Sequence, residues 1–276
     1  MPELPEVETV KETLKYYLIG KTINKVIVRY DKMIHGISVT DFQNKLQSHS
    51  FTDINRYGKY LFFILGDIVL ISHLRMEGKY FIKSEDEVLE KHEHVIFYMT
   101  DGTSLRYHDT RKFGTMEIAE KGQQYQTDSI RKMGPEPFDQ EFSGAYLQSK
   151  AKNSRRPVKV FLLDQNTLSG LGNIYVDEVL FCSNLHPETP VNLLTIDDFN
   201  QLAQASKDVL SKAISLGGTT IRSYMSSLGV TGRFQNELMV HMRENELCFH
   251  CQTPIIKIKV GGRGTYLCPT CQKRKG

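Results

Sequence analysis

The first eight residues, MPELPEVE, place a proline in second position with acids beside it. If Met1 is removed, Pro2 becomes a secondary amine at the start of the chain. Such an amine has a pKa near ~7.7–8.0, so a useful fraction is an unprotonated nucleophile at neutral pH. It can attack a sugar-like carbon and form a cationic iminium, while the carboxylates of Glu3 and Glu6 move protons. This stretch could therefore perform covalent catalysis.

The same stretch also fits the start of an amphipathic helix. Acids suit the positive end of the helix dipole, and Pro2 and Pro5 fit a first turn. Apolar residues recur at intervals of three and four, as on one helix face: Val7, Val10, Leu14 and Leu18. These residues alone leave both interpretations open.

Four of the five cysteines form two pairs near the C-terminus, Cys248 with Cys251 and Cys268 with Cys271, with 16 residues between the pairs. This spacing fits a tetrahedral four-thiolate zinc site, and closed sites of that kind are structural. Two disulfides are the alternative, but the sequence shows no secretion signal and cytosolic thiols stay reduced. We therefore predict one structural Zn²⁺.

The segment between the cysteine pairs predicts a β-hairpin that points Lys257, Lys259 and Arg263 outward. Residues 252–276 hold six basic residues and no acid, and a basic zinc hairpin most often meets phosphate. The alternative is a basic tail that is simply exposed to solvent. The net charge of +3 adds little, because the distribution of charge matters more than its sum.

A chain of 276 residues is long enough for two domains. Residues 21–120 are rich in β-branched and aromatic runs, and Asp101-Gly102 is a hairpin signal, so we expect a mainly antiparallel β domain with a helix at its front. A polar, proline-containing stretch follows. We place the N-terminal domain at 1–125 and the linker at 126–140. No apolar run approaches the ~20 residues that span a membrane, so we expect a cytoplasmic protein.

Beyond the linker the pattern is helical. Pro157 suits a helix start, residues 173–181 form a helix, and Thr195 with Asp198 three residues later is an N-cap signature. Residues 217–232 lack a helical or strand period, which indicates a loop. We place a helical domain at 141–235 and the zinc finger at 236–276. Cys182 is expected to be an inert core thiol.

The motifs MPELPEVE, DTRKFG, LLDQNTLSGLGNIYVDEVLF and GGTTIR precede the four cysteines in this order. The chain thereby resembles the bacterial formamidopyrimidine-DNA glycosylases over essentially its whole length. The resemblance implies an α+β fold of two domains. An N-terminal antiparallel β-sandwich with a front helix is followed by a helix–two-turn–helix domain, which ends in a four-cysteine zinc-finger β-hairpin. A monomer is the default expectation.

The resemblance also implies a function: base excision repair of oxidised purines, namely 8-oxoguanine and formamidopyrimidines, in duplex DNA. Pro2 would attack C1′ of the damaged nucleotide, with Glu3 as acid/base and Glu6 in support, and Lys59 would contact phosphate near the lesion. The resulting Schiff base permits β- and δ-elimination, so an abasic site would be cut as well. The protein would then associate with the nucleoid by binding DNA.

Further residues acquire roles only through the resemblance. Met76, Arg111 and Phe113 would fill the gap that the extruded base leaves; without it, Met76 and Phe113 would be assigned to the core. The remaining expected DNA contacts are His73, Asn173, Tyr175, His241 and Arg263. The lesion-base loop would use Thr219, Ile221, Arg222, Ser223 and Tyr224.

The stretch 241–247 departs from the family pattern Tyr-Gly-Arg-x-Gly-x-Pro, because it reads His-Met-Arg-Glu-Asn-Glu-Leu. His241 stands where the phosphate-contacting tyrosine is expected, and it could donate to phosphate when protonated. A non-catalytic zinc-ribbon DNA-binding or lesion-sensing protein is the alternative function, but it would not need Pro2 beside Glu3 and Glu6. An enzyme for oxidised pyrimidines is disfavoured by the RKFG and GGTTIR motifs.

Overall fold

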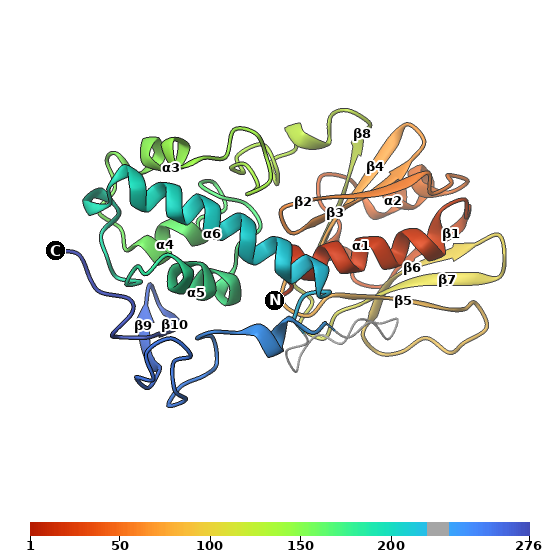
Figure 1. Cartoon of the computed structure of the whole chain (residues 1–276). Helices are drawn as coiled ribbons and strands as arrows, with labels where there is room; N and C mark the ends of the chain where they lie inside the picture. Colours follow the sequence, from red (N-terminus) through yellow and green to blue (C-terminus); the bar gives the residue numbers. More distant parts are fainter. Residues whose placement is uncertain (220–231) are drawn as a thin grey trace. The chain divides into compact units, whose positions relative to one another are not determined.

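The computed structural model describes residues 1–219 and 232–276 (Figure 1). They form two compact units. The N-terminal unit holds residues 1–131 with Thr219 and Gly232, and the C-terminal unit holds residues 132–218 and 233–276. Among the described residues, no helix combines the length and apolar character that a membrane crossing needs.

The N-terminal unit contains two four-stranded sheets in which every strand pairing is antiparallel. Their strand orders are β1-β6-β7-β5 and β2-β3-β4-β8. The elements are α1 (Leu4–Leu18), β1 (Ile23–Val28), η1 (Asp31–Met33), α2 (Val39–Leu46), β2 (Asp53–Tyr57), β3 (Tyr60–Leu65), β4 (Ile68–His73), β5 (Lys79–Ser84), β6 (Glu93–Met99), β7 (Thr103–His108), β8 (Thr115–Glu120) and η2 (Gln124–Gln126).

One apolar core joins both sheets to the two helices. Phe97 and Leu105 come from the first sheet, Phe63 and Leu70 from the second, and Val7 from α1. Burial of this apolar surface is the main favourable contribution to folding of the unit. The predicted antiparallel sandwich with a helix at its front is confirmed.

Three connections cross from one sheet to the other, and two of them are short loops. Residues 74–78 run from β4 to β5, and residues 109–114 run from β7 to β8. Because β4 pairs with β8 and β5 pairs with β7, these two loops lie side by side at one end of the sandwich. His73 faces Thr115 across one sheet, and Lys79 faces His108 across the other.

The C-terminal unit is helical and ends in a two-stranded hairpin. Its longest helix, α6, packs against α3 and α5, and the predicted cap is present because Thr195 Oγ1 accepts from the Asp198 N–H at 3.3 Å. The elements are α3 (Gly144–Ala151), α4 (Val158–Leu163), α5 (Asn173–Cys182), η3 (Val191–Leu193), α6 (Ile196–Ser215), η4 (Phe234–Glu237), β9 (Ile256–Val260) and β10 (Arg263–Leu267).

One expectation about this unit is wrong. Cys182, predicted to be a core thiol, is exposed. It is the last residue of α5, and the apolar period that suggested burial applies to the turns before it. Its neighbour Phe181 takes the buried position.

Candidate functional site

The chain start is both a helix start and a buried site. Pro2 and Glu3 are buried, and α1 begins at Leu4 directly after Glu3. The Glu3 N–H donates to Glu6 Oε2 at 2.8 Å, which is half of a capping box. The two interpretations that the sequence left open are therefore compatible, because the cap holds the residues that chemistry would use.

The second oxygen of Glu6 reaches a residue distant in the chain. Glu6 Oε1 accepts from the backbone N–H of Thr219 at 2.8 Å and from its hydroxyl at 3.1 Å. The carboxylate thus links the chain start to Thr219, the first of the residues expected to contact the damaged base. The Thr219 N–H is occupied by Glu6, so its predicted contact with a damaged base stays a prediction.

Lys59 lies in the two-residue turn between β2 and β3 and is buried. Burial lowers the pKa of the Met1 terminal ammonium below its ordinary value of 8.0, and the charge of Lys59 acts in the same direction. The carboxylates of Glu3 and Glu6 oppose this shift. The net shift is downward, so the surroundings of the chain end disfavour a charged ammonium at Met1.

The two crossing loops carry exposed side chains. Met76 is 38% exposed and Phe113 is 52% exposed, so neither belongs to the core. The Arg111 guanidinium carbon lies 4.8 Å from the centroid of the Phe113 ring, a cation–π distance. Two apolar tips and one cation therefore stand at the same end of the sandwich.

His73 lies at the base of these loops and is buried. Its Nδ1 accepts from the Arg75 N–H at 2.9 Å. Burial, followed by the charges of Arg75 and Lys59, lowers the pKa of His73 to about 3. The ring is therefore neutral near pH 7, and with Nδ1 accepting, its proton is on Nε2, which can donate to a phosphate oxygen.

In the C-terminal unit, the start of α5 is bonded to the hairpin. Asn173 Nδ2 donates to the carbonyl of Gly264 at 3.0 Å, next to the exposed Arg263. Tyr175 is fully buried, with its ring centroid 5.4 Å from that of Phe234. A buried ring in this position contributes to packing, and the contact of Tyr175 with DNA stays a prediction.

A buried polar network ties α4, α5 and the hairpin together. Lys159 and Asp177 are fully buried and form an ion pair of 2.7 Å. Lys159 also donates to Thr265 Oγ1 at 2.8 Å and to the Gly264 carbonyl at 3.2 Å. His241 is buried, and its Nδ1 lies 2.8 Å from Asp177 Oδ2. The hairpin is thus attached to the helices through one carboxylate.

A second buried acid was missed by sequence reasoning. Glu178 accepts the backbone N–H groups of Met239, Val240 and His241 at 2.7, 3.1 and 2.8 Å. Burial raises the pKa of Glu178, and these three N–H groups oppose the shift. The available signal was the pair of adjacent acids, Asp177-Glu178, inside an otherwise apolar helix.

The four predicted zinc ligands converge. Their sulfur atoms all lie within 4.8 Å of one another, with Cys251 to Cys268 at 3.4 Å and Cys248 to Cys271 at 3.9 Å. In a tetrahedral zinc site with Zn–S bonds of about 2.3 Å, the sulfur atoms lie about 3.8 Å apart. The two sulfur atoms of a disulfide lie only about 2 Å apart. The set therefore fits one structural zinc ion.

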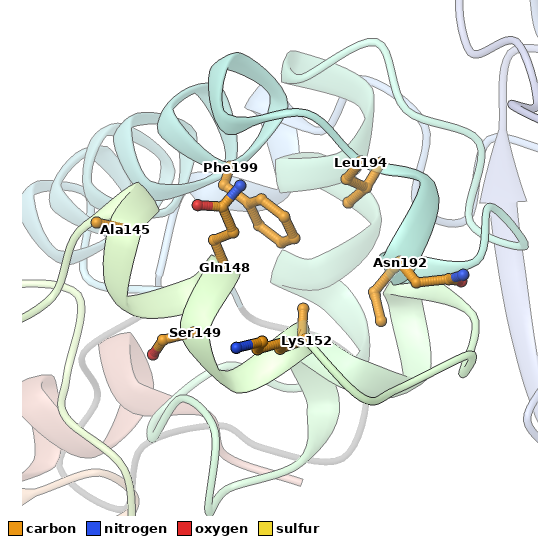
Figure 2. Close-up of a pocket in the computed structure, with 9 residues that line it drawn as sticks. Ala145, Gln148, Ser149, Lys152, Asn192, Leu194 and Phe199 are labelled. Atoms are coloured by element: carbon orange, nitrogen blue, oxygen red, sulfur yellow. The ribbon is translucent and has the colours of Figure 1, made fainter.

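Four of the predicted lesion-base residues, Ile221, Arg222, Ser223 and Tyr224, lie outside the described residues. A separate hollow of about 460 Å³ lies between α3 and the segment from Val191 to Phe199 (Figure 2). Apolar Leu194 and Phe199 and polar Gln148 and Lys152 line it. Its lining includes none of the predicted site residues.

Comparison with known families covers most of the chain. Residues 1–116 match the formamidopyrimidine-DNA glycosylase N-terminal domain, residues 133–225 match the formamidopyrimidine-DNA glycosylase H2TH domain, and residues 245–274 match the zinc finger found in FPG and IleRS. The matches follow the order that the sequence motifs predicted.

Similar proteins extend over the full length. The formamidopyrimidine-DNA glycosylase of Bacillus licheniformis is 48% identical over 99% of this chain and 100% of its own. That of Oceanobacillus iheyensis is 46% identical over 100% of this chain and 99% of its own.

Solved structures of similar proteins also match this chain over almost its full length. Lactococcus lactis Fpg in complex with an abasic site containing DNA superposes with a TM-score of 0.92 at 40% identity, covering 99% of this chain and 100% of that one. The wild-type Lactococcus lactis protein in complex with an N7-benzyl-Fapy-dG containing DNA gives 0.92 at 41%, with the same coverage. Sequence motifs, domain order and three-dimensional structure together place this chain in the formamidopyrimidine-DNA glycosylase family.

Proposed function

We propose that the chain excises oxidised purines from duplex DNA and then cuts the strand at the resulting abasic site, with Pro2 as the nucleophile. The observation that carries this proposal is the chain start, where Pro2, Glu3 and Glu6 are buried, together with the buried Lys59. The full-length relatives are formamidopyrimidine-DNA glycosylases. Their bacterial source suits a cytoplasmic enzyme that meets the nucleoid through its substrate.

The reaction begins when the neutral Pro2 nitrogen bonds to C1′ and the bond from C1′ to the damaged base breaks; the N–H proton of the resulting ammonium passes to the departing base. Glu3 protonates the sugar ring oxygen as the ring opens, and the product is an iminium between Pro2 and C1′. This cation withdraws electrons, so loss of a proton from C2′ expels the 3′-phosphate. A second elimination, with loss of a proton from C4′, expels the 5′-phosphate, and water then releases the sugar fragment from Pro2.

The damaged base must leave the stack before Pro2 can reach C1′. The exposed tips Met76 and Phe113 suit insertion into the gap, and Arg111 can bond the orphaned base. Neutral His73 offers Nε2–H to a phosphate, and Arg263 offers a charge. Zinc, when bound, supplies only a fixed scaffold for the hairpin that carries Arg263.

A non-catalytic lesion sensor is the second candidate, because the zinc hairpin and the exposed tips would serve it equally. It has no use for a buried Pro2 beside Glu3 and Glu6. The two candidates therefore differ in the fate of the damaged base and not in affinity for DNA.

Replacement of the nucleophile separates the two candidates. We expect Pro2→Gly to reduce single-turnover release of 8-oxoguanine by at least about 10²-fold, because the secondary amine and its fixed ring are lost. Affinity for a duplex with an abasic-site analogue should stay within about threefold, since the DNA contacts are elsewhere. Pro5→Ala, in the same first turn, keeps the amine and serves as control. Release by Pro2→Gly at the wild-type rate would exclude this nucleophile.

Glu6 offers a test of the positioning of the chain start. In Glu6→Gln an amide replaces one acceptor, so either the Glu3 N–H or the Thr219 N–H loses its partner. Loss of a buried hydrogen bond costs about 1–3 kcal/mol of unfolding free energy. We expect that destabilisation in thermal unfolding, together with slower excision. Glu12→Gln changes an exposed acid of the same helix and should leave both measurements unchanged. Wild-type stability and excision in Glu6→Gln would contradict this role.

His241 is expected to contact a DNA phosphate. Its ring is buried and fixed by Asp177, because Nδ1 lies 2.8 Å from Oδ2. We expect His241→Ala to weaken binding of a duplex with an abasic-site analogue by about tenfold, the contribution of one hydrogen bond to a charged group.

Fluorescence-anisotropy titrations measure this loss of affinity. His35→Ala, which changes an exposed histidine of the N-terminal unit, is the control and should keep the wild-type affinity. Wild-type affinity in His241→Ala would show that His241 does not bind phosphate.

A further inference from the structure

The two loops that carry the exposed tips share a buried support. Tyr107, on β7, is fully buried, and its hydroxyl lies against Gly78 and Gly114. A Cβ built on Gly114 would lie 1.7 Å from the hydroxyl oxygen, and one built on Gly78 would lie 2.1 Å from it. Neither glycine has a positive φ. Glycine is therefore required at both positions because any side chain there would overlap Tyr107, and not because of the backbone conformation.

A buried carboxylate shapes the second loop. Asp109 is fully buried and accepts three backbone N–H groups of its own loop, each at 2.9 Å: Arg111 on Oδ1, and Phe113 and Gly114 on Oδ2. Hydrogen bonds to a charged acceptor are about twice as strong as neutral ones. They hold a tight turn in which Lys112 adopts a φ of 57°.

Asp109 is itself fixed to the sheet. Its backbone N–H donates to the His92 carbonyl at 3.0 Å. Its carbonyl lies 2.9 Å from His94 Nε2, which donates to it. The carboxylate therefore holds the loop from a rigid position on the β6–β7 side of the sandwich.

The two loops are also bonded to each other. The Thr110 hydroxyl donates to Glu77 Oε2 across them. Within the first loop, the Gly78 N–H donates to the Leu74 carbonyl at 2.9 Å and closes the turn that presents Met76. The tips in the two loops are thus set relative to one another before any DNA is present.

We propose that Tyr107 and Asp109 are positioning residues for base extrusion. Both are fully buried, so they act on DNA only through the tips that they hold. Tyr107 sets the spacing of the two loops, and Asp109 sets the shape of the loop that carries Arg111 and Phe113. This inference rests on the proposed function, because the tips matter only if a base leaves the stack.

The test compares two rates in each variant. Single-turnover release of 8-oxoguanine from a duplex requires insertion of the tips. Cleavage of a preformed abasic site in a single-stranded oligonucleotide requires the Pro2 amine but no insertion. The ratio of the two rates isolates the positioning role, since a general loss of folded protein lowers both rates equally.

We expect the ratio to fall about tenfold in Asp109→Ala and about threefold in Tyr107→Phe, because a misplacement of about 1 Å can cost about 10²-fold in rate. Tyr107→Phe removes one oxygen and keeps the ring. Tyr98→Phe, at a half-buried tyrosine of β6 in the same sheet, is the matched control and should keep the wild-type ratio.

An unchanged ratio in both variants, or an equal fall of both rates, would overturn the proposal. If Asp109→Ala fails to fold, as judged by thermal unfolding and zinc content, Tyr107→Phe decides. Failure of the proposed function would appear differently, as wild-type protein that neither releases 8-oxoguanine nor cleaves the abasic site.

Discussion

The hydrogen bonding of the Glu6 carboxylate is the constraint on which the candidate active site depends. A buried carboxylate is costly unless its oxygens are bonded. Here one oxygen accepts from the Glu3 N–H and the other accepts from Thr219. The first bond fixes the chain start, and the second fixes Thr219, the first of the residues expected to contact the damaged base. The nucleophile and the beginning of the expected lesion-base loop are therefore held by one side chain.

The same physical device recurs at other segments expected to meet DNA. Asp109 accepts hydrogen bonds from backbone N–H groups of the loop that carries Arg111 and Phe113. Glu178 gathers those of residues 239–241, and Asp177 bonds His241 and Lys159. Surface loops have few apolar contacts to fix their shape. Buried acids supply the missing restraint through the backbone, and exposed side chains stay available for the ligand.

The sequence was sufficient for local and covalent features. The cysteine spacing predicted the metal site, Thr195 predicted a helix cap, and the alternating hairpin strands predicted which basic residues face outward. It failed for residues whose role depends on distant partners. Glu178 accepts hydrogen bonds from a segment more than sixty residues away. Tyr107 leaves no space for a side chain at Gly78 or Gly114, which lie in two loops that only the sheet pairing brings together. Burial of Tyr175 and exposure of Cys182 likewise depend on tertiary packing, which a periodic pattern does not encode.

The central claim is that the buried chain start is a covalent catalyst, and borohydride trapping tests it most directly. The protein is mixed with a duplex that contains one 8-oxoguanine opposite cytosine, sodium borohydride is added, and the crosslinked peptide is sequenced. The account predicts a reduced adduct on Pro2, in protein that has lost Met1. An adduct on a lysine, or no adduct from protein with a processed N-terminus that binds the lesion, would contradict it.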